Sequence, residues 1–177
     1  MATSFATEYS AVQKKLGVLN PHGVPQITAV VLNVGVGKSR DSKQHLEAVR
    51  RDLALISGQH PHERLARKAI AGFNVREGNI VAYRVTLHGR RMEDFVKRFV
   101  HVTLPRVRDF RGLSPRSIDN GGNLNVGMKE QLPFPEIKAE ETDVIFGVQV
   151  TFVTSATNRD EAEVLFRTLG FPLTEAN

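Results

Sequence analysis

The aliphatic run ITAVVLNV at residues 27–34 is the strongest secondary-structure signal in this chain. Runs of this length that are rich in β-branched residues and bounded by turn residues are typical of a buried β-strand. A turn sequence, NPHG, precedes the run, and the glycines of GVG at 35–37 end it. A buried strand needs other layers around it, so the chain is predicted to form a globular fold.

Four helices are predicted where apolar residues recur at helical spacing or where caps mark the ends of a segment. In chain order they are residues 8–17 ended by Gly17, a helix capped by Ser39 or Asp41 and ended by Gly58, a helix that carries Met92, Phe95, Val96, Phe99 and Val100 and ends before Pro105, and a helix capped by Asn158.

Further strands are predicted at 69–76 and 79–87, paired as a hairpin around Glu77-Gly78, and at 146–154. Residues 105–125 are rich in Pro, Gly, Asn and Arg and are predicted to form a long loop or arm, a feature that is usually functional. The order indicates an α+β fold, with a mostly antiparallel sheet, helices packed on one face and the other face free for a ligand. We expect a single domain over residues 1–177, with a short N-terminal segment at 1–23.

Charge is distributed unevenly along the chain, although the net charge is only +5. Residues 61–116 hold thirteen basic side chains, eleven of them Arg, against five acidic ones, whereas residues 136–163 hold two basic and seven acidic. Arg binds phosphate bidentately and stacks on bases, so the basic segment favours a nucleic-acid partner over an evenly solvated surface. The acidic segment suggests a different neighbour.

Composition excludes several classes of protein. The chain has no Cys, which removes disulfides, thiolate nucleophiles, cysteine-zinc sites and iron–sulfur clusters. No apolar run approaches the roughly 18–20 residues of a membrane span, and the N-terminus lacks the pattern of a secretory signal. We therefore expect no membrane partner.

Several motifs resemble enzyme chemistry without completing it. The sequence GVGKS at 35–39 lies between a strand and a helix, as a phosphate-binding loop does, but Leu32 stands where that loop requires its first glycine. HERLA at 62–66 begins like a zinc-protease helix, yet Ala66 replaces the second histidine, and His60 and His62 are expected in an exposed loop. No catalytic residue, metal site or cofactor is predicted, and a nucleotide hydrolase remains one alternative.

Three uncharged polar residues occupy positions suited to contacting RNA. Asn33 interrupts the aliphatic strand, Gln59 follows the end of a helix, and Thr86 alternates with apolar residues in a strand. If the sheet has a free face, Asn33 and Thr86 could share it and hydrogen-bond to bases, phosphates or 2′-hydroxyls. Each of the three could instead be a buried residue that satisfies backbone groups.

Basic residues would surround these positions with a field that attracts phosphate; they are Arg67, Lys68, Arg76 and Arg84. Phe73 and Tyr83 lie in the same basic stretch, and either could stack on a base. Strand aromatics more often pack in the core, and we expect this of Phe73. The signature of the RNA-recognition motif is absent.

Six ordered sequence blocks between about residues 24 and 173 carry a family resemblance. They are LNVGVG (32–37), ISGQ (56–59), ARKAIAGFNVREG (66–78), VTLHG (85–89), PRVRDFRGL (105–113) and FPEI (134–137). Together they resemble the universal 5S-rRNA-binding family of ribosomal proteins, number five of the bacterial large subunit.

The resemblance implies a structural protein without catalysis, placed in the cytoplasm within the ribosome. It implies an antiparallel sheet whose concave face binds 5S rRNA in the central protuberance, beside the large-subunit rRNA. Asn33, Gln59 and Thr86 match the family's uncharged RNA-contact positions. The family's hairpin loop reaches the elbow of P-site tRNA, and the matching positions here are Asn74, Val75, Arg76, Glu77 and Gly78. The family also contacts a small-subunit head protein across an inter-subunit bridge.

Departures from the family pattern are few. The segment before the first strand is shorter than usual, Asn74 stands where a lysine is usual, and His88 stands where an arginine is common. Both substitutions remove a fixed positive charge. A second alternative to RNA binding is a protein-interaction module that uses the acidic segment.

Overall fold

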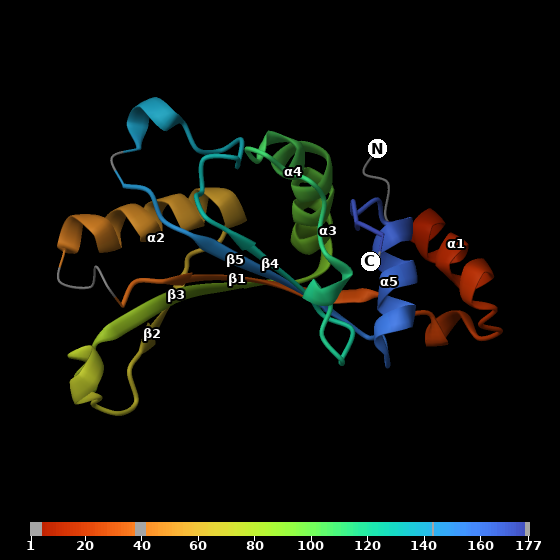
Figure 1. Ribbon diagram of the computed structural model, residues 1–177, viewed down its shortest axis with the longest axis horizontal. Coiled ribbons are helices and arrows are strands. Elements are labelled where there is room, and N and C mark those ends of the chain that lie inside the picture. Colours follow the sequence, from red (N-terminus) through yellow and green to blue (C-terminus); the bar gives the residue numbers. More distant parts are fainter. Residues whose placement is uncertain (1–4, 38–41, 143, 176–177) are drawn as a thin grey trace. The chain divides into compact units, whose positions relative to one another are not determined.

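The computed structural model of the protein describes residues 5–37, 42–142 and 144–175 (Figure 1). The helices are α1 (Ala6–Leu16), α2 (Lys43–Ser57), α3 (Gly89–Arg98), α4 (Leu104–Arg106) and α5 (Arg159–Thr168), and the strands are β1 (Ile27–Gly35), β2 (His62–Leu65), β3 (Ile80–Leu87), β4 (Leu124–Met128) and β5 (Val148–Thr154). The strands form one antiparallel sheet in the order β2-β3-β1-β5-β4. This architecture confirms the predicted α+β class. Within the described ranges, every helix is too short or too polar to cross a membrane.

The chain divides into two compact units, each assembled from segments that are distant in sequence. Unit 1 comprises Met1–Val30, Leu87–Val126 and Thr151–Asn177, and unit 2 comprises Val31–Thr86 and Gly127–Val150. Because β1, β3, β4 and β5 contribute residues to both units, the division crosses the sheet. The single domain expected over residues 1–177 remains a prediction.

In unit 2, helix α2 covers one face of the strands (Figure 1). Its apolar face buries Val49, Leu53 and Ile56 completely. The helix begins after Ser42, whose hydroxyl accepts a hydrogen bond from the His45 N–H at 3.3 Å, and ends at Gly58, which has a φ of +65°. The predicted Gly58 cap is confirmed. The predicted N-cap was wrong: Ser42 takes that place, and Ser39 and Asp41 lie outside the described residues.

In the hairpin next to α2, the predicted strand at 79–87 is confirmed as β3, whereas the strand predicted at 69–76 does not form. The strand that pairs with β3 is β2, with His62 opposite Arg84 and Glu63 opposite Tyr83. Residues 66–79 form a long connecting loop that contains only a short 3-10 turn, Ala71–Phe73. Every residue of β2 is exposed, so this edge strand lacks the alternating apolar pattern by which strands are recognised.

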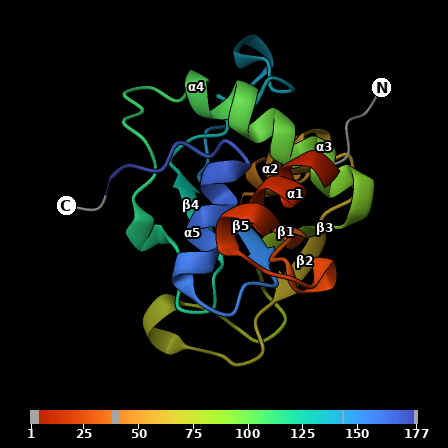
Figure 2. The same ribbon diagram turned by 90° about the vertical axis from the view of Figure 1, so that its right-hand side faces the viewer.

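Unit 1 has an aromatic core between helices and strand β5. Phe152 on β5 lies 5.2 Å from Phe99 and 4.9 Å from Phe171, measured between ring centroids, and all three rings are buried. The tilted and edge-on geometries are those that aromatic pairs prefer. Helix α1 packs beside α5 (Figure 2), where the Lys15 ammonium donates a hydrogen bond to the Thr168 hydroxyl at 3.1 Å.

Two further predictions for unit 1 were wrong at their C-terminal ends. The helix expected to end before Pro105 continues through a π-helical turn, Phe99–Thr103, into α4. Pro105, which has no backbone N–H, lies one residue before α4 ends at Arg106. The loop expected over 105–125 already enters β4, whose Leu124, Val126 and Met128 are buried at alternate positions.

Helix α5 begins with a reciprocal cap, in which Asn158 and Glu161 each accept hydrogen bonds at the helix start. The contribution of this cap to stability is expected to depend on pH. As predicted, Asn158 caps the helix, accepting from the Glu161 N–H at 2.9 Å, and the Glu161 carboxylate accepts from the Thr157 hydroxyl at 2.8 Å and the Thr157 N–H at 3.1 Å. The Thr157 side-chain hydrogen bond, with the backbone one, lowers the pKa of Glu161 below its usual 4.5. A lowered folded-state pKa stabilises the fold above about pH 4.5, and this contribution is lost as the pH falls through the folded-state value.

We therefore expect Glu161→Gln to reduce the free energy of unfolding at pH 7, and to reduce it by less at pH 3, because protonation of the wild-type carboxyl removes part of its contribution as the pH falls. Urea denaturation at the two pH values measures the difference. Asp160→Asn is the control, because it removes a neighbouring first-turn charge and leaves the cap intact. A deficit of Glu161→Gln that is the same at both pH values would contradict the account.

Candidate nucleic-acid interface

The strands of unit 2 present polar side chains on the face opposite α2. On β3, Tyr83 and Val85 are buried while Arg84 and Thr86 are half-buried, and on β1 Asn33 is half-buried between two buried neighbours. Alternate residues of a strand point to opposite faces, so Asn33, Arg84 and Thr86 share one side. Among the described residues of unit 2, no helix covers this side (Figure 1), which we call the open face.

Gln59 lies beside Thr86, at the turn that ends α2. Its side-chain amide donates to the Thr86 carbonyl oxygen at 3.5 Å, the outer limit of a hydrogen bond. The turn itself is fixed by Ser57, whose hydroxyl donates to the Leu53 carbonyl at 2.7 Å and accepts from the Gln59 N–H at 3.2 Å. Two predicted site residues that are 27 positions apart in sequence therefore lie together.

Arg84 carries an unmet hydrogen-bond donor on the same face. Its Nε is buried and has no hydrogen-bond partner among the described residues. An unsatisfied buried donor costs about 1–3 kcal/mol, more when the group is charged, and an acceptor on a bound ligand would remove that cost. An unmet donor of this kind marks Arg84 as a candidate site residue.

Two residues of the open face were missed by the sequence-based assignment. His62 is opposite Arg84 and Arg64 is opposite Ala82 in the β2–β3 register, so both point to the open face. The prediction that His62 lies in a loop was wrong. The local sequence gives no signal for either position, since only the pairing with β3 shows which way they point.

The predicted tRNA-contact loop extends from the end of this hairpin. The Ala66 N–H donates to Asn79 O at 2.8 Å, and the Gly78 N–H donates to Ala66 O at 3.0 Å, which closes the base of the loop. Asn74 adopts a left-handed φ of +51°, a conformation that Asn tolerates. Val75 is half-buried, and the remaining predicted site residues of the loop are exposed; they are Arg67, Lys68, Asn74, Arg76, Glu77 and Gly78.

Of the two aromatic candidates, Phe73 is placed opposite to expectation. Phe73, expected in the core, is 73% exposed at the loop, whereas Tyr83 is only 3% exposed and faces away from the open side. Burial raises the pKa of the Tyr83 phenol, and the charge of Glu63 adds to that effect. Phe73, and not Tyr83, is therefore available to stack on a base.

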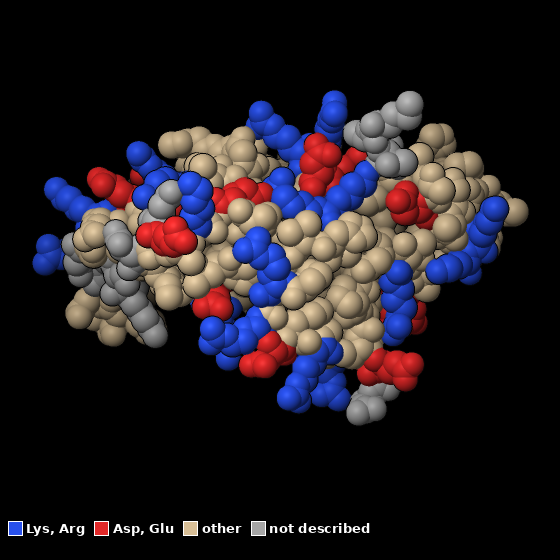
Figure 3. Space-filling view, turned by 90° about the horizontal axis from the view of Figure 1, so that it is seen from above, with Lys and Arg blue, Asp and Glu red and all other residues tan. Residues whose placement is uncertain are grey.

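Charge differs between the two faces of unit 2. Around α2, basic and acidic side chains are interspersed (Figure 3). On the open face, the described strand positions that point outward include Arg64 and Arg84 but no Asp or Glu. A polar face with arginines and without carboxylates attracts polyanions.

The described residues of the enzyme-like motifs do not assemble a catalytic site. The Val36 N–H, which a phosphate-binding loop would direct at a phosphate, donates to Val81 O at 2.9 Å and so belongs to the sheet. Lys38 and Ser39 lie outside the described residues. Within the part of the chain that is described, no three His, Asp or Glu side chains are grouped to hold a metal ion.

An α+β fold with an open polar sheet face edged by arginines is typical of proteins that bind nucleic acid without catalysis. Comparison with known proteins narrows this class. Residues 20–76 match the model of "Ribosomal protein L5", and residues 80–173 match the separate model of the C-terminus of the same ribosomal family.

Curated relatives agree with the family models. The chain is 47% identical over 162 residues to the large ribosomal subunit protein uL5 of Rubrobacter xylanophilus, which covers 92% of this chain and 90% of the relative. It is 46% identical to the uL5 proteins of Dictyoglomus thermophilum, with the same coverage, and of Prochlorococcus marinus, where 90% of this chain and 89% of the relative are covered. The chain belongs to the ribosomal protein L5 family. It is a structural, non-enzymatic constituent of the large ribosomal subunit.

The contrast between Phe73 and Tyr83 gives a test of the site geometry. We expect Tyr83→Ala to reduce the free energy of unfolding by about 3–5 kcal/mol, because it empties a packed aromatic site. Phe73→Ala should change it by less than about 0.5 kcal/mol, because the ring is at the surface. Urea denaturation measures both values, and a large loss for Phe73→Ala would contradict the placement of the loop.

Proposed function

We propose that the open face of unit 2 binds 5S rRNA and attaches it in the central protuberance of the large subunit. The observation that carries this proposal is the grouping of Asn33, Gln59 and Thr86 at one side of the sheet beside the unmet donor of Arg84. These are the positions that match the family's uncharged RNA contacts. Membership of the family supports ribosomal RNA as the ligand class.

The two kinds of residue have separate tasks in this proposal. The amide and hydroxyl groups of Asn33, Gln59 and Thr86 are donors and acceptors suited to base edges and 2′-hydroxyls, whose geometry distinguishes one RNA site from another. Arg67, Lys68 and Arg84 neutralise phosphate and contribute affinity without much sequence preference. The face is built on paired strands, so little conformational entropy is lost on binding.

Further contacts of the subunit are proposed on the same basis. The loop at 66–78 reaches P-site tRNA through its exposed tip. The positive charge of Arg76 there partly replaces the charge of the lysine that is usual in the family at the position of Asn74. The protein also contacts large-subunit rRNA, and a small-subunit head protein across the inter-subunit bridge. The acidic segment supports the last contact, because basic proteins of the ribosome are complementary to it.

The first test is a titration against 5S rRNA in the presence of an unrelated RNA of equal length. We expect Thr86→Ala and Asn33→Ala each to weaken binding by about 1–3 kcal/mol, because each leaves a buried RNA group without its hydrogen bond. Thr7→Ala, an exposed change on α1, is the matched control and should bind like the wild type.

Unchanged affinity of both variants, with the fold intact by circular dichroism, would reject the site. Binding of the wild type that the unrelated RNA abolishes would reject the 5S assignment itself and leave only a basic surface.

The basic residues are tested by the salt dependence of the same titration. Arg67→Ala and Arg76→Ala should each reduce the slope of log affinity against log salt by about one unit, because each removes one phosphate contact. Arg90→Ala is the control, since Arg90 is highly exposed but lies near Asp94 at 3.9 Å on α3. A slope that does not change would exclude the tested arginine from the interface.

A further inference from the structure

The segment Pro105 to Gly112 of unit 1 begins with the last two residues of α4 and continues as irregular backbone, and we call it the arginine arm. The buried side chains of Leu104 and Leu113, 1% and 8% exposed, hold its two ends. Between them no residue is buried, and the sequence PRVRDFRG supplies three arginines against one aspartate. The arm is therefore an exposed basic strip fixed at both ends.

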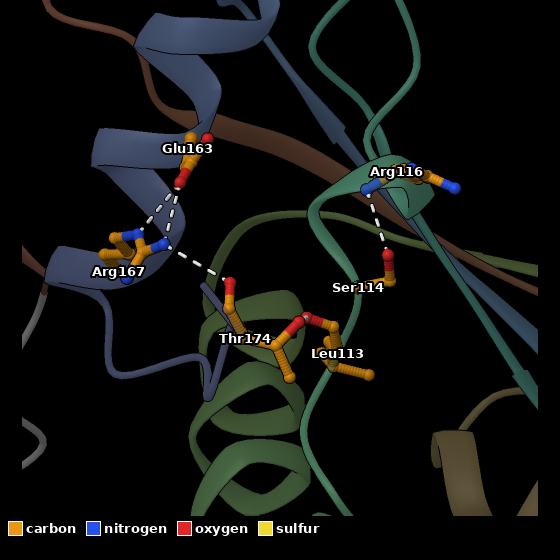
Figure 4. A network of polar contacts seen from close by, with 6 residues as sticks. All are labelled: Leu113, Ser114, Arg116, Glu163, Arg167 and Thr174. Carbon is orange, nitrogen blue, oxygen red and sulfur yellow. Dashed lines mark hydrogen bonds and ion pairs between the residues drawn. The ribbon is translucent and has the colours of Figure 1, made fainter. Parts of the chain in front are cut away.

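Backbone contacts fix the C-terminal end of the arm. The Leu113 N–H donates to Pro172 O at 2.8 Å, and the Thr174 N–H donates to Leu113 O at 2.9 Å. Leu113 and Thr174 lie side by side in Figure 4. Gly112 has a φ of +100°, and a Cβ there would lie 2.7 Å from the Thr174 side chain and 3.1 Å from Pro172 O. Only glycine fits this close approach. These contacts hold the C-terminal end of the arm in one position before any ligand binds.

The arginines of the arm differ from other arginines of unit 1 in their partners. Arg167 is bound to Glu163 at 2.8 Å (Figure 4), and Arg90 lies 3.9 Å from Asp94. Within the described residues, by contrast, the arm's arginines make no ion pair and no side-chain hydrogen bond; they are Arg106, Arg108 and Arg111. No carboxylate of the described residues neutralises the positive charge of these three side chains.

The neighbouring Arg116 marks where this strip ends. It lines a cleft of about 690 Å³ together with Arg159, Asp160, Glu163 and Glu175. Three carboxylates against two arginines give this cleft a net negative charge, whereas the arm has three arginines and one aspartate, so an RNA backbone is favoured along the arm and not along the cleft. The contact surface is accordingly the stretch from Arg106 to Arg111.

We infer that the arginine arm binds the phosphate backbone of ribosomal RNA, as a contact of unit 1 additional to the open face of unit 2. The chemistry favours RNA over an acidic protein, because all three bases are Arg, whose planar guanidinium pairs with phosphate bidentately. The protein is also a constituent of an RNA-rich particle. The inference rests on family membership and does not depend on the proposed 5S rRNA contact.

The test compares the free protein with intact large ribosomal subunits that contain it. Phenylglyoxal modifies accessible arginines, and mass spectrometry gives the rate at each one. We expect Arg106, Arg108 and Arg111 to react at least about tenfold more slowly in the subunit, because a bidentate phosphate contact blocks the guanidinium. Ultraviolet cross-linking of the same subunits should attach a ribosomal nucleotide to a peptide covering residues 105–113.

Each other outcome overturns the inference. Equal reactivity in both samples would mean that the arm contacts nothing in the subunit. Protection accompanied by cross-links to a neighbouring protein, and by no nucleotide adduct, would make the partner a protein. Failure of the open-face variants to weaken 5S rRNA binding would reject the other proposal and leave this result unaffected.

Variants separate charge from folding. Subunits assembled with Arg108→Gln/Arg111→Gln should lose the protein at a lower salt concentration than those with Arg90→Gln/Lys14→Gln, which removes the same charge elsewhere on unit 1. Equal thermal unfolding midpoints of the two free proteins would establish that both fold. Equal salt release of the two would overturn the inference.

Discussion

The burial of one sheet face against helices is the interaction on which the rest of the structure depends. In unit 2, α2 supplies Val49, Leu53 and Ile56 to a core completed by alternate residues of β1 and β3. An antiparallel sheet needs only one covered face for stability. The opposite face is therefore free to carry Asn33, Arg84 and Thr86, residues that would be costly inside a two-sided core. The same alternation that stabilises the fold presents the candidate site.

The end of α2 connects this core to the site. Because Gly58 adopts a left-handed conformation, the chain turns back at once and brings Gln59 to the Thr86 carbonyl. A side chain at position 58 would strain this turn, since L residues rarely adopt that conformation. The residue at which α2 ends therefore also sets the position of Gln59 relative to Thr86. A shift of α2 along the sheet would displace Gln59 from the strands with which it shares the open face.

Elements with a strong local signal were predictable, and those that depend on pairing were not. The aliphatic run of β1 and the caps at Gly58 and Asn158 identify their elements directly. Strand β2 has no buried residue, so only its pairing with β3 defines it and places His62 on the open face. Phe73 was assigned to the core by residue type alone. A loop residue buries its ring only where other parts of the fold pack against it, and the Phe73 ring is exposed. The common side of Asn33 and Thr86 followed from strand alternation, while their contact with RNA remains a prediction.

The arrangement of charge separates affinity from selectivity. Arginines on the loop and on the arm are exposed, and their attraction to phosphate is long-ranged, weakened by salt and indifferent to sequence. The uncharged groups of the open face act only at hydrogen-bond distance and only in one orientation. A protein that must bind one RNA among many similar polyanions needs both kinds of contact, because charge alone would hold it equally well anywhere on the particle. The uncharged groups, which confer selectivity, lie on paired strands that hold them in one geometry. The charged groups lie on exposed segments, where a fixed geometry matters less for attraction to phosphate.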